Sequence, residues 1–244
     1  GLRQYVGYFR TWEPGYGRTI GRSVTSDLGR WPHPETIVMP DEQDPFGTDL
    51  YNNAASLYRV PGDEAHFFFI SAFDHASDTL GVQLATSRDG WHYKRLCRDT
   101  FVVPGNSFDR GGAYTCPGIH RVGDELVMMY HAVSYKHAEA TPDKIRYSGA
   151  YVVLRFPRDR FQGLHVDGDF EFSVPVERDA DGRLNVTLNA SVAPGGRIRA
   201  GVLPARDEQA FLPGFAPQDG APVTGDGVSL PLNWKGGAIP PYPA

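Results

Sequence analysis

The sequence is poor in the residues that mark several large classes of protein. Its 244 residues contain only two cysteines, Cys97 and Cys116, which form neither a Cys-x-x-Cys pair nor a zinc-ligand pattern. No apolar run approaches the roughly 18 residues of a membrane-spanning helix, so we expect no membrane partner. Lys and Arg form no block and the formal net charge is −5, so we expect no nucleic-acid partner. Phosphate-loop, Gly-x-Ser-x-Gly and His-Glu-x-x-His motifs are also missing, and we expect no metal and no other cofactor.

Turn-forming and aromatic residues are abundant instead. The chain has 28 glycines and 20 prolines, together more than an average soluble domain carries. Aromatic residues make up 12% of the sequence, which is too many for a disordered chain. No helical periodicity is sustained. Many turns combined with many aromatic residues predict an all-β protein of short strands.

An internal repeat organises the first two thirds of the sequence. Thr25-Ser26 and Thr86-Ser87 lie about 60 residues apart, and each pair is followed by Asp, Gly and Trp. Similar apolar strands, residues 5–10 and 65–71, precede the two pairs, and a third strand follows at residues 125–131. Because Asp27 and Asp89 repeat with the turns, we expect them to cap the turns rather than to carry function.

The repeat favours a β-propeller. A unit of about 60 residues and about four strands fits one propeller blade. Three units reach residue 164, whereas a closed ring needs at least about four blades. We therefore predict a partial propeller of about three blades in residues 1–164, and expect the sequence to be a fragment of a longer protein. An irregular β-sandwich with similar turns is the alternative fold.

A different pattern begins near residue 165. Four stretches alternate between apolar and polar residues as sandwich strands do: 170–174, 183–189, 196–202 and 228–234. Residues 165–244 are therefore predicted to form a small C-terminal β-sandwich that is truncated.

Several stretches resemble a known superfamily. The Ser-Arg-Asp-Gly-Trp turn at residues 87–91 is similar to turns of the five-bladed β-propeller glycoside hydrolases of families 32, 43 and 68. Residues 5–12, 49–54, 107–112, 213–215 and 224–226 resemble an uncharacterised bacterial group that joins this propeller to a C-terminal β-sandwich. The resemblance implies a carbohydrate substrate and hydrolysis of a glycosidic bond, with catalytic carboxylates in the first three blades.

Three aspartates are the candidate catalytic residues. Glycosidases use two carboxylates on either side of a sugar, one as acid and the other as base or nucleophile. Asp49 precedes a predicted inner strand, Asp74 follows the apolar strand at 67–73, and Asp109 precedes the third inner strand. The alternative for each is a local role, as an Asx turn, a solvated hairpin or a loop ion pair.

The residues expected to bind the sugar share positions near the ends of the same strands. They are Arg10, Trp12, Tyr51, Asn52, His75, Arg110, Tyr114 and His131.

These observations favour a glycoside hydrolase-like enzyme that cleaves a glycosidic bond with paired carboxylates in the propeller channel. A non-catalytic carbohydrate-binding or scaffold propeller is the main alternative. A protein-interaction propeller is a further one, and it predicts an apolar patch on the blade faces.

Overall fold

The computed structural model describes residues 3–60, 63–176, 184, 186–204 and 210–239. The chain divides into two compact units, Gly1–Phe156 and Pro157–Ala244. The boundary expected after residue 164 lies a few residues inside the second unit and stays a prediction. Each unit is described by itself below.

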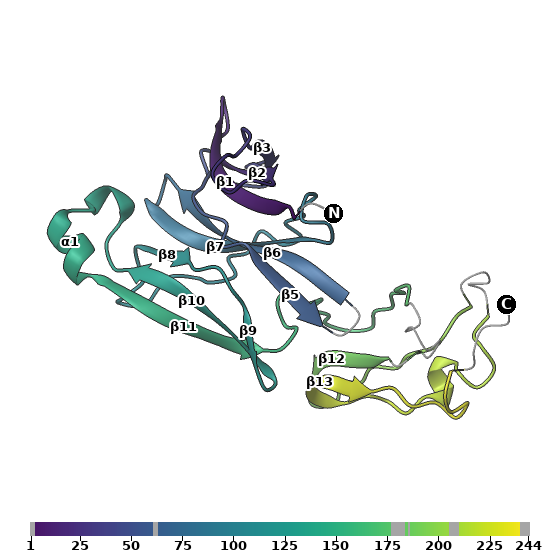
Figure 1. Ribbon diagram of the computed structural model, residues 1–244. Helices are drawn as coiled ribbons and strands as arrows, with labels where there is room; N and C mark the ends of the chain where they lie inside the picture. The colour runs from purple at the N-terminus through teal and green to yellow at the C-terminus, as the bar shows by residue number, and fades with distance from the viewer. Residues whose placement is uncertain (1–2, 61–62, 177–183, 185, 205–209, 240–244) are drawn as a thin grey trace. The chain divides into compact units, whose positions relative to one another are not determined.

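The prediction of an all-β chain is confirmed (Figure 1). The helical segments are short: η1 (His137–Glu139), α1 (Pro142–Tyr147) and η2 (Pro217–Asp219). None of the described helices is long and apolar enough to cross a membrane. The strands are β1 (Tyr5–Glu13), β2 (Gly17–Thr25), β3 (Glu35–Val38), β4 (Asp49–Leu50), β5 (Ser56–Val60), β6 (Asp63–Asp74), β7 (Thr79–Ser87), β8 (Gly112–Thr115), β9 (His120–Val122), β10 (Glu125–Val133), β11 (Gly149–Pro157), β12 (Thr187–Val192) and β13 (Gly225–Pro231).

The first sheet has the order β1-β2-β3. Strands β1 and β2 form an antiparallel hairpin that runs from the pair Tyr5↔Thr25 to the pair Glu13↔Gly17. Gly17 closes the turn with a φ of 78°, a left-handed conformation that glycine adopts without steric cost. The hairpin therefore places residues near Glu13 and Gly17 at the same end of the sheet.

The second sheet has eight strands, with β11-β10-β8-β7-β6-β4 as its main path. A single parallel pairing, Leu80↔Gly112, joins β7 to β8 and so unites two groups of strands. Gly111 lies at this junction, where its N–H donates to the Val133 carbonyl at 2.9 Å. A Cβ at Gly111 would overlap the carbonyl of Tyr135, so only glycine fits here.

The repeat seen in the sequence appears as repeated hairpins. Strands β1 and β2 pair antiparallel, β6 and β7 do the same, and β10 and β11 are neighbours in the sheet. The Asp27 carboxylate accepts a hydrogen bond from Gly29 N–H at 2.9 Å, and the Asp89 carboxylate accepts one from Trp91 N–H at 2.8 Å. Both aspartates therefore cap turns, as their repetition predicted.

Both faces of β6 are buried. Phe68 and Ile70 belong to a core that also contains Ile20 and Leu50. On the opposite face, Phe69 is fully buried and lies 5.4 Å from the ring of Phe101. Burial of these large side chains is the main stabilising contribution of the first unit.

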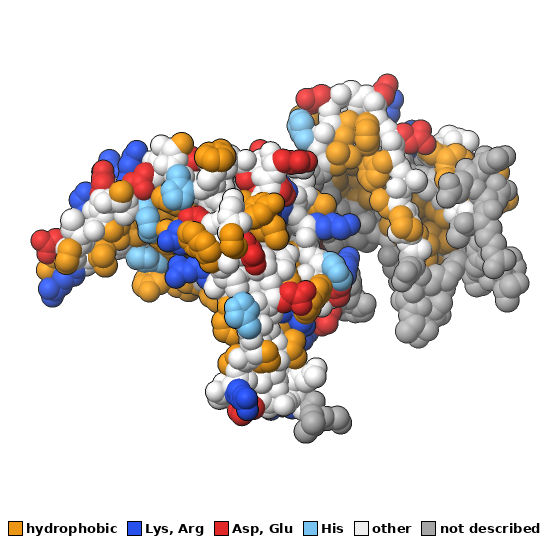
Figure 2. All heavy atoms as spheres, turned by 90° about the horizontal axis from the view of Figure 1, so that it is seen from above, with side chains coloured by type: hydrophobic (Ala, Val, Ile, Leu, Met, Phe, Trp, Pro, Cys, Tyr) orange, Lys and Arg blue, Asp and Glu red, His pale blue; other side chains and the backbone are white. Residues whose placement is uncertain are grey.

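One face of β10 and β11 is covered far less. Met128 is 1% exposed, whereas the next residue, Met129, is 43% exposed because strand residues alternate between faces. Tyr151, whose ring lies 5.3 Å from that of His131, is 73% exposed on the same side as Met129. Figure 2 shows apolar side chains at the surface among the charged ones. This uncovered face contrasts with the buried faces of β6.

A buried ion pair fixes the loop before β4. The Arg95 side chain is 4% exposed and the Asp44 side chain 1%, with 2.7 Å between Nη2 and the carboxylate. Arg95 also donates to the Met39 carbonyl at 2.8 Å. Asp41 lies 3.2 Å from Arg95 and Arg98 lies 3.5 Å from Asp44, so the two buried charges are compensated mainly by each other and also by these neighbours.

The described residues of the second unit form fewer regular strands than the sequence pattern predicts. Strands β12 and β13 pair antiparallel, and a single bridge, Ile198↔Val223, is formed within the stretch expected at 196–202. Residues 170–174 form no strand, and Phe170 and Phe172 are exposed, so that expectation was wrong. Residues 183 and 185 of the stretch 183–189 lie outside the described residues.

Candidate functional site

Asp49 is the most constrained of the three predicted aspartates. It lies in β4, opposite Phe73 of β6, and its side chain is 5% exposed. Its Oδ1 accepts a hydrogen bond from the backbone N–H of Arg18 at 2.6 Å. Its Oδ2 lies 2.6 Å from Arg18 Nη1 and 2.9 Å from His75 Nε2. A carboxylate removed from water is thus surrounded by donors.

The hairpin turn makes this arrangement possible. Arg18 directly follows Gly17, and a Cβ at Gly17 would overlap Asp49 Oδ1. Glycine at this position therefore serves both the left-handed turn and the close approach of the carboxylate.

The surroundings keep Asp49 ionised. Burial raises the pKa of Asp49, but the backbone N–H of Arg18, the His75 ring and the Arg18 guanidinium together outweigh it. The pKa of Asp49 consequently lies below its usual value. At neutral pH this ionised group is suited to accept hydrogen bonds and not to donate a proton.

Two arginines lie over aromatic rings beside Asp49. Arg18 Cζ is 4.7 Å from the centre of the Tyr51 ring and 5.5 Å from that of Trp12. Trp12 and Arg18 are cross-strand partners in the β1–β2 hairpin, which explains their contact. Arg10 Cζ lies 5.9 Å from the Tyr51 ring centre. Trp12 is 63% exposed, so one face of the group is open to solvent.

His137 joins the aromatic part of the site. Its Nε2 lies 3.0 Å from the Tyr51 hydroxyl and its Nδ1 lies 3.2 Å from the Tyr114 hydroxyl. The Phe73 ring is 5.0 Å from the His137 ring and 4.5 Å from the His75 ring. Burial, above all, raises the pKa of Tyr114 to about 12, so this hydroxyl stays protonated.

We call this group the Asp49 cluster. It comprises Arg10, Trp12, Arg18, Asp49, Tyr51, Phe73, His75, Tyr114 and His137.

Asp74 holds its own turn. Its carboxylate accepts hydrogen bonds from Ala76 N–H at 3.0 Å and from the Ser77 hydroxyl at 2.7 Å. The Ser77 hydroxyl makes the largest contribution to a pKa of Asp74 below its usual value. The carboxylate therefore caps the β6–β7 hairpin, directly after the residue that pairs with Asp49.

Asp109 holds the loop before β8. It is 1% exposed and accepts hydrogen bonds from Gly105 N–H at 2.9 Å, Asn106 N–H at 2.7 Å and the Tyr130 hydroxyl at 3.0 Å. Burial raises the pKa of Asp109, but these donors outweigh it and the pKa lies below its usual value. The three aspartates thus accept hydrogen bonds from three different sets of groups.

The predicted sugar-binding residues divide into two sets. Arg10, Trp12, Tyr51, His75 and Tyr114 belong to the Asp49 cluster.

The other three predicted residues make different contacts. Asn52 Nδ2 donates to the Thr115 carbonyl at 2.9 Å, and Arg110 Nε donates to the Ser134 carbonyl at 2.8 Å. His131 lies beside the rings of Tyr114 and Tyr151.

Four residues of the site were not among the predicted ones: Gly17, Arg18, Phe73 and His137. The Gly-Tyr-Gly sequence at residues 15–17 is a turn signal that would have placed Arg18 opposite Trp12. No local pattern identifies His137, because its partners lie far away in the sequence.

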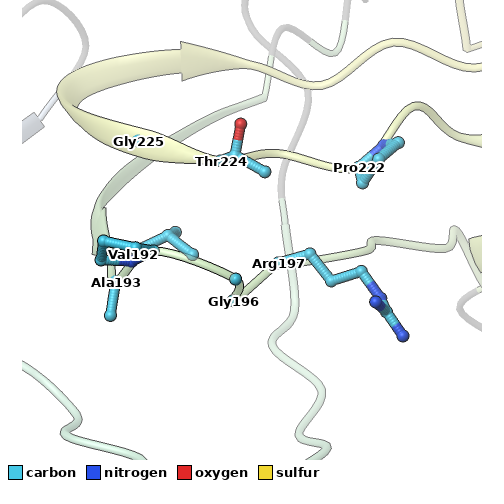
Figure 3. A pocket seen from close by; sticks show the side chains of 9 residues that line it. Val192, Ala193, Gly196, Arg197, Pro222, Thr224 and Gly225 are labelled. Atoms are coloured by element: carbon cyan, nitrogen blue, oxygen red, sulfur yellow. The ribbon is translucent and has the colours of Figure 1, made fainter.

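The other candidate sites contain fewer charged and polar side chains. A hollow in the second unit is lined by backbone and mostly small side chains, with Arg197 at one side (Figure 3). Within the described ranges, His, Cys, Asp and Glu side chains do not gather in threes as a metal site requires.

Comparisons with known proteins give distant structural likenesses. No protein-family model and no curated protein matches the sequence. A solved structure described as a glycoside hydrolase is 16% identical, with a TM-score of 0.44 over 68% of this chain and 45% of that chain. Another, described as a complex of BT0996 and RGII, is 17% identical, with a TM-score of 0.42 over 64% of this chain and 42% of that chain. The chain spans less than half the length of these structures.

Proposed function

We propose that the first unit binds a carbohydrate at the Asp49 cluster. One observation carries the proposal: the exposed ring of Trp12 lies against Arg18, whose guanidinium is paired with the buried Asp49 carboxylate. A sugar presents an apolar C–H face that packs on aromatic rings and hydroxyl groups that hydrogen-bond to charged side chains. The cluster offers both kinds of contact side by side.

Hydrolysis of a glycosidic bond is the second candidate function. Asp49 supports it, because a buried carboxylate that stays ionised suits the role of nucleophile. Asp74 is the nearest predicted partner along the sheet, since it follows the residue that pairs with Asp49. To act as the acid, Asp74 would have to give up the Ser77 hydrogen bond, which holds its pKa below the usual value, and take up a proton. Asp109 is a weaker candidate because it is 1% exposed and its hydrogen-bond donors lie outside the Asp49 cluster.

We also propose that the first part of the chain forms blades of a β-propeller and that the C-terminal part forms a β-sandwich. The hairpins β1–β2 and β6–β7, and the neighbouring strands β10 and β11, support a series of blades. In such a series, the Asp49 cluster draws its side chains from two successive repeats, from β8 and from the loop that follows β10.

Binding can be tested by calorimetric titration of neutral oligosaccharides into the full chain and two tryptophan variants. We expect Trp12→Ala to weaken binding about fivefold or more, since stacking on an exposed ring supplies on the order of 1 kcal/mol or more. Trp91→Ala is the matched control, because Arg22 lies over its ring at 4.7 Å. Equal binding by both variants would mean that the Asp49 cluster is not the binding site.

Hydrolysis needs a separate assay of reducing ends released from the same oligosaccharides. We expect Asp49→Asn and Asp74→Asn each to lower turnover by about a hundredfold or more. Asp99→Asn, a change at an exposed aspartate, should leave it unchanged. Turnover that survives both substitutions would refute the carboxylate pair and leave the binding proposal intact.

A further inference from the structure

The Asp49 cluster carries more positive than negative charge. Arg10 and Arg18 both lie over the Tyr51 ring, whereas Asp49 is paired only with Arg18 and His75. Among the residues that the structure describes, the Arg10 guanidinium contacts the Tyr51 ring and no carboxylate. One full positive charge is therefore uncompensated, on a chain whose net charge is −5.

The acidic groups of β1 and of the β6–β7 turn are engaged elsewhere. Glu13 alternates to the other side of β1, where its carboxylate accepts a hydrogen bond from the Thr36 hydroxyl at 2.5 Å. The Asp74 carboxylate caps its hairpin, and the Asp78 carboxylate accepts a hydrogen bond from Ala138 N–H at 3.0 Å. None of these groups neutralises Arg10.

Arg10 and Trp12 are placed to contact one sugar together. They are two residues apart on β1 and so project from the same face, about 7 Å apart along the strand. Both are exposed. An aromatic ring can support the ring of a sugar while a guanidinium pairs with a charged substituent beside it.

We propose that the glycan bound at the Asp49 cluster is acidic, with a uronic acid whose ring packs on Trp12 and whose carboxylate pairs with Arg10. This inference rests on the proposed carbohydrate-binding function. The planar guanidinium matches a carboxylate with two parallel N–H···O bonds, which a hydroxyl cannot form. Arg18 adds positive potential at the same place, although Asp49 already occupies one of its nitrogens.

The test compares oligosaccharides of galacturonic or glucuronic acid with galactose or glucose oligosaccharides of equal length, by calorimetry on the full chain. We expect the acidic oligosaccharides to bind at least about tenfold more tightly at low salt, with the difference shrinking as salt is added. Arg10→Gln should abolish the preference, so that acidic and neutral oligosaccharides bind this variant with affinities within about twofold of each other. Arg10→Lys should retain part of it, because the charge stays and the paired geometry is lost. Arg121→Gln, an exposed arginine of β9, is the control for net charge.

The possible results distinguish a failure of this inference from a failure of the proposed carbohydrate-binding function. Neutral and acidic oligosaccharides that bind equally through Trp12 would refute the inference and leave the carbohydrate site standing. A preference that survives Arg10→Gln would also refute it. Tighter binding of sulfated neutral oligosaccharides than of uronic acids would overturn the carboxylate assignment. If no oligosaccharide of any class binds, both proposals fall.

Discussion

The structure allows the effect of Asp49→Asn on the free energy of unfolding to be estimated from named hydrogen bonds. The carboxylate accepts two hydrogen bonds from Arg18 and is in contact with His75. The asparagine oxygen can keep one of these bonds, but its amide N–H₂ group would face the guanidinium, donor against donor. Two charge-assisted bonds are lost. Because Arg18 and His75 are partly exposed, water compensates some of that loss, leaving about 2 kcal/mol of destabilisation.

Thermal unfolding of the full chain measures this effect. For a unit of this size, about 2 kcal/mol corresponds to a fall in Tm of about 4–8 °C in the transition of the first unit. Asp99→Asn serves as the control and should shift Tm by less than about 1 °C. An Asp49→Asn protein that unfolds at the wild-type temperature at pH 7 would refute the reasoning.

The pH dependence of stability provides an independent check on the direction of the Asp49 pKa shift. Because the pKa of Asp49 is lower in the folded than in the unfolded chain, the contribution to stability is complete above the unfolded value of about 3.9. It is lost as the pH falls through the folded pKa. The stability difference between wild type and Asp49→Asn should therefore be smaller at pH 3 than at pH 5. A difference that grows between pH 5 and pH 3 would contradict this assignment.

Three further predictions concern stability. Gly111→Ala should abolish soluble folded protein, since the new Cβ would overlap a backbone carbonyl. Gly163→Ala is the control and should express normally, because its Cβ would lie in open space. Equal yields of the two variants would contradict the packing at β8. Tyr130→Phe removes one hydroxyl donor from a buried carboxylate and should cost about 1–2 kcal/mol in urea unfolding. Arg95→Ala leaves Asp44 buried without its closest partner and should cost about 3 kcal/mol, with little dependence on salt; an effect that disappears in high salt would indicate a surface ion pair instead.

The hairpins could be predicted from the sequence because their signals are local. Alternating strands and turn residues define β1–β2 and β6–β7, and the repeated aspartates cap the turns that follow them. The single parallel pairing Leu80↔Gly112 could not be predicted, since no turn or alternation marks a contact between strands that are distant in sequence. Residues 170–174 alternate between apolar and polar residues as a strand does, but they form no strand. Alternation defines which side of a strand is apolar, but it does not provide a neighbouring strand for backbone hydrogen bonds.

The candidate site could be predicted only in part for a similar reason. Asp49 and Asp74 look alike in the sequence, as aspartates at the ends of strands. The serine three residues after Asp74 is a local signal for a turn cap. The partner of Asp49 is Arg18, more than one strand away, and it can be identified only once the hairpin and the sheet have been assembled.

The uneven coverage of β10 has a practical consequence for studying this protein in solution. Met128 and Met129 are neighbours in the sequence, yet one is buried and the other is open to solvent. Mild peroxide oxidises accessible thioethers first, so Met129 should become a sulfoxide before Met128 does. One peptide analysed by mass spectrometry thus contains both a probe and its internal reference. The rate at Met129 reports whether anything covers the face formed with Tyr151, and the rate at Met128 reports whether the strand itself has opened.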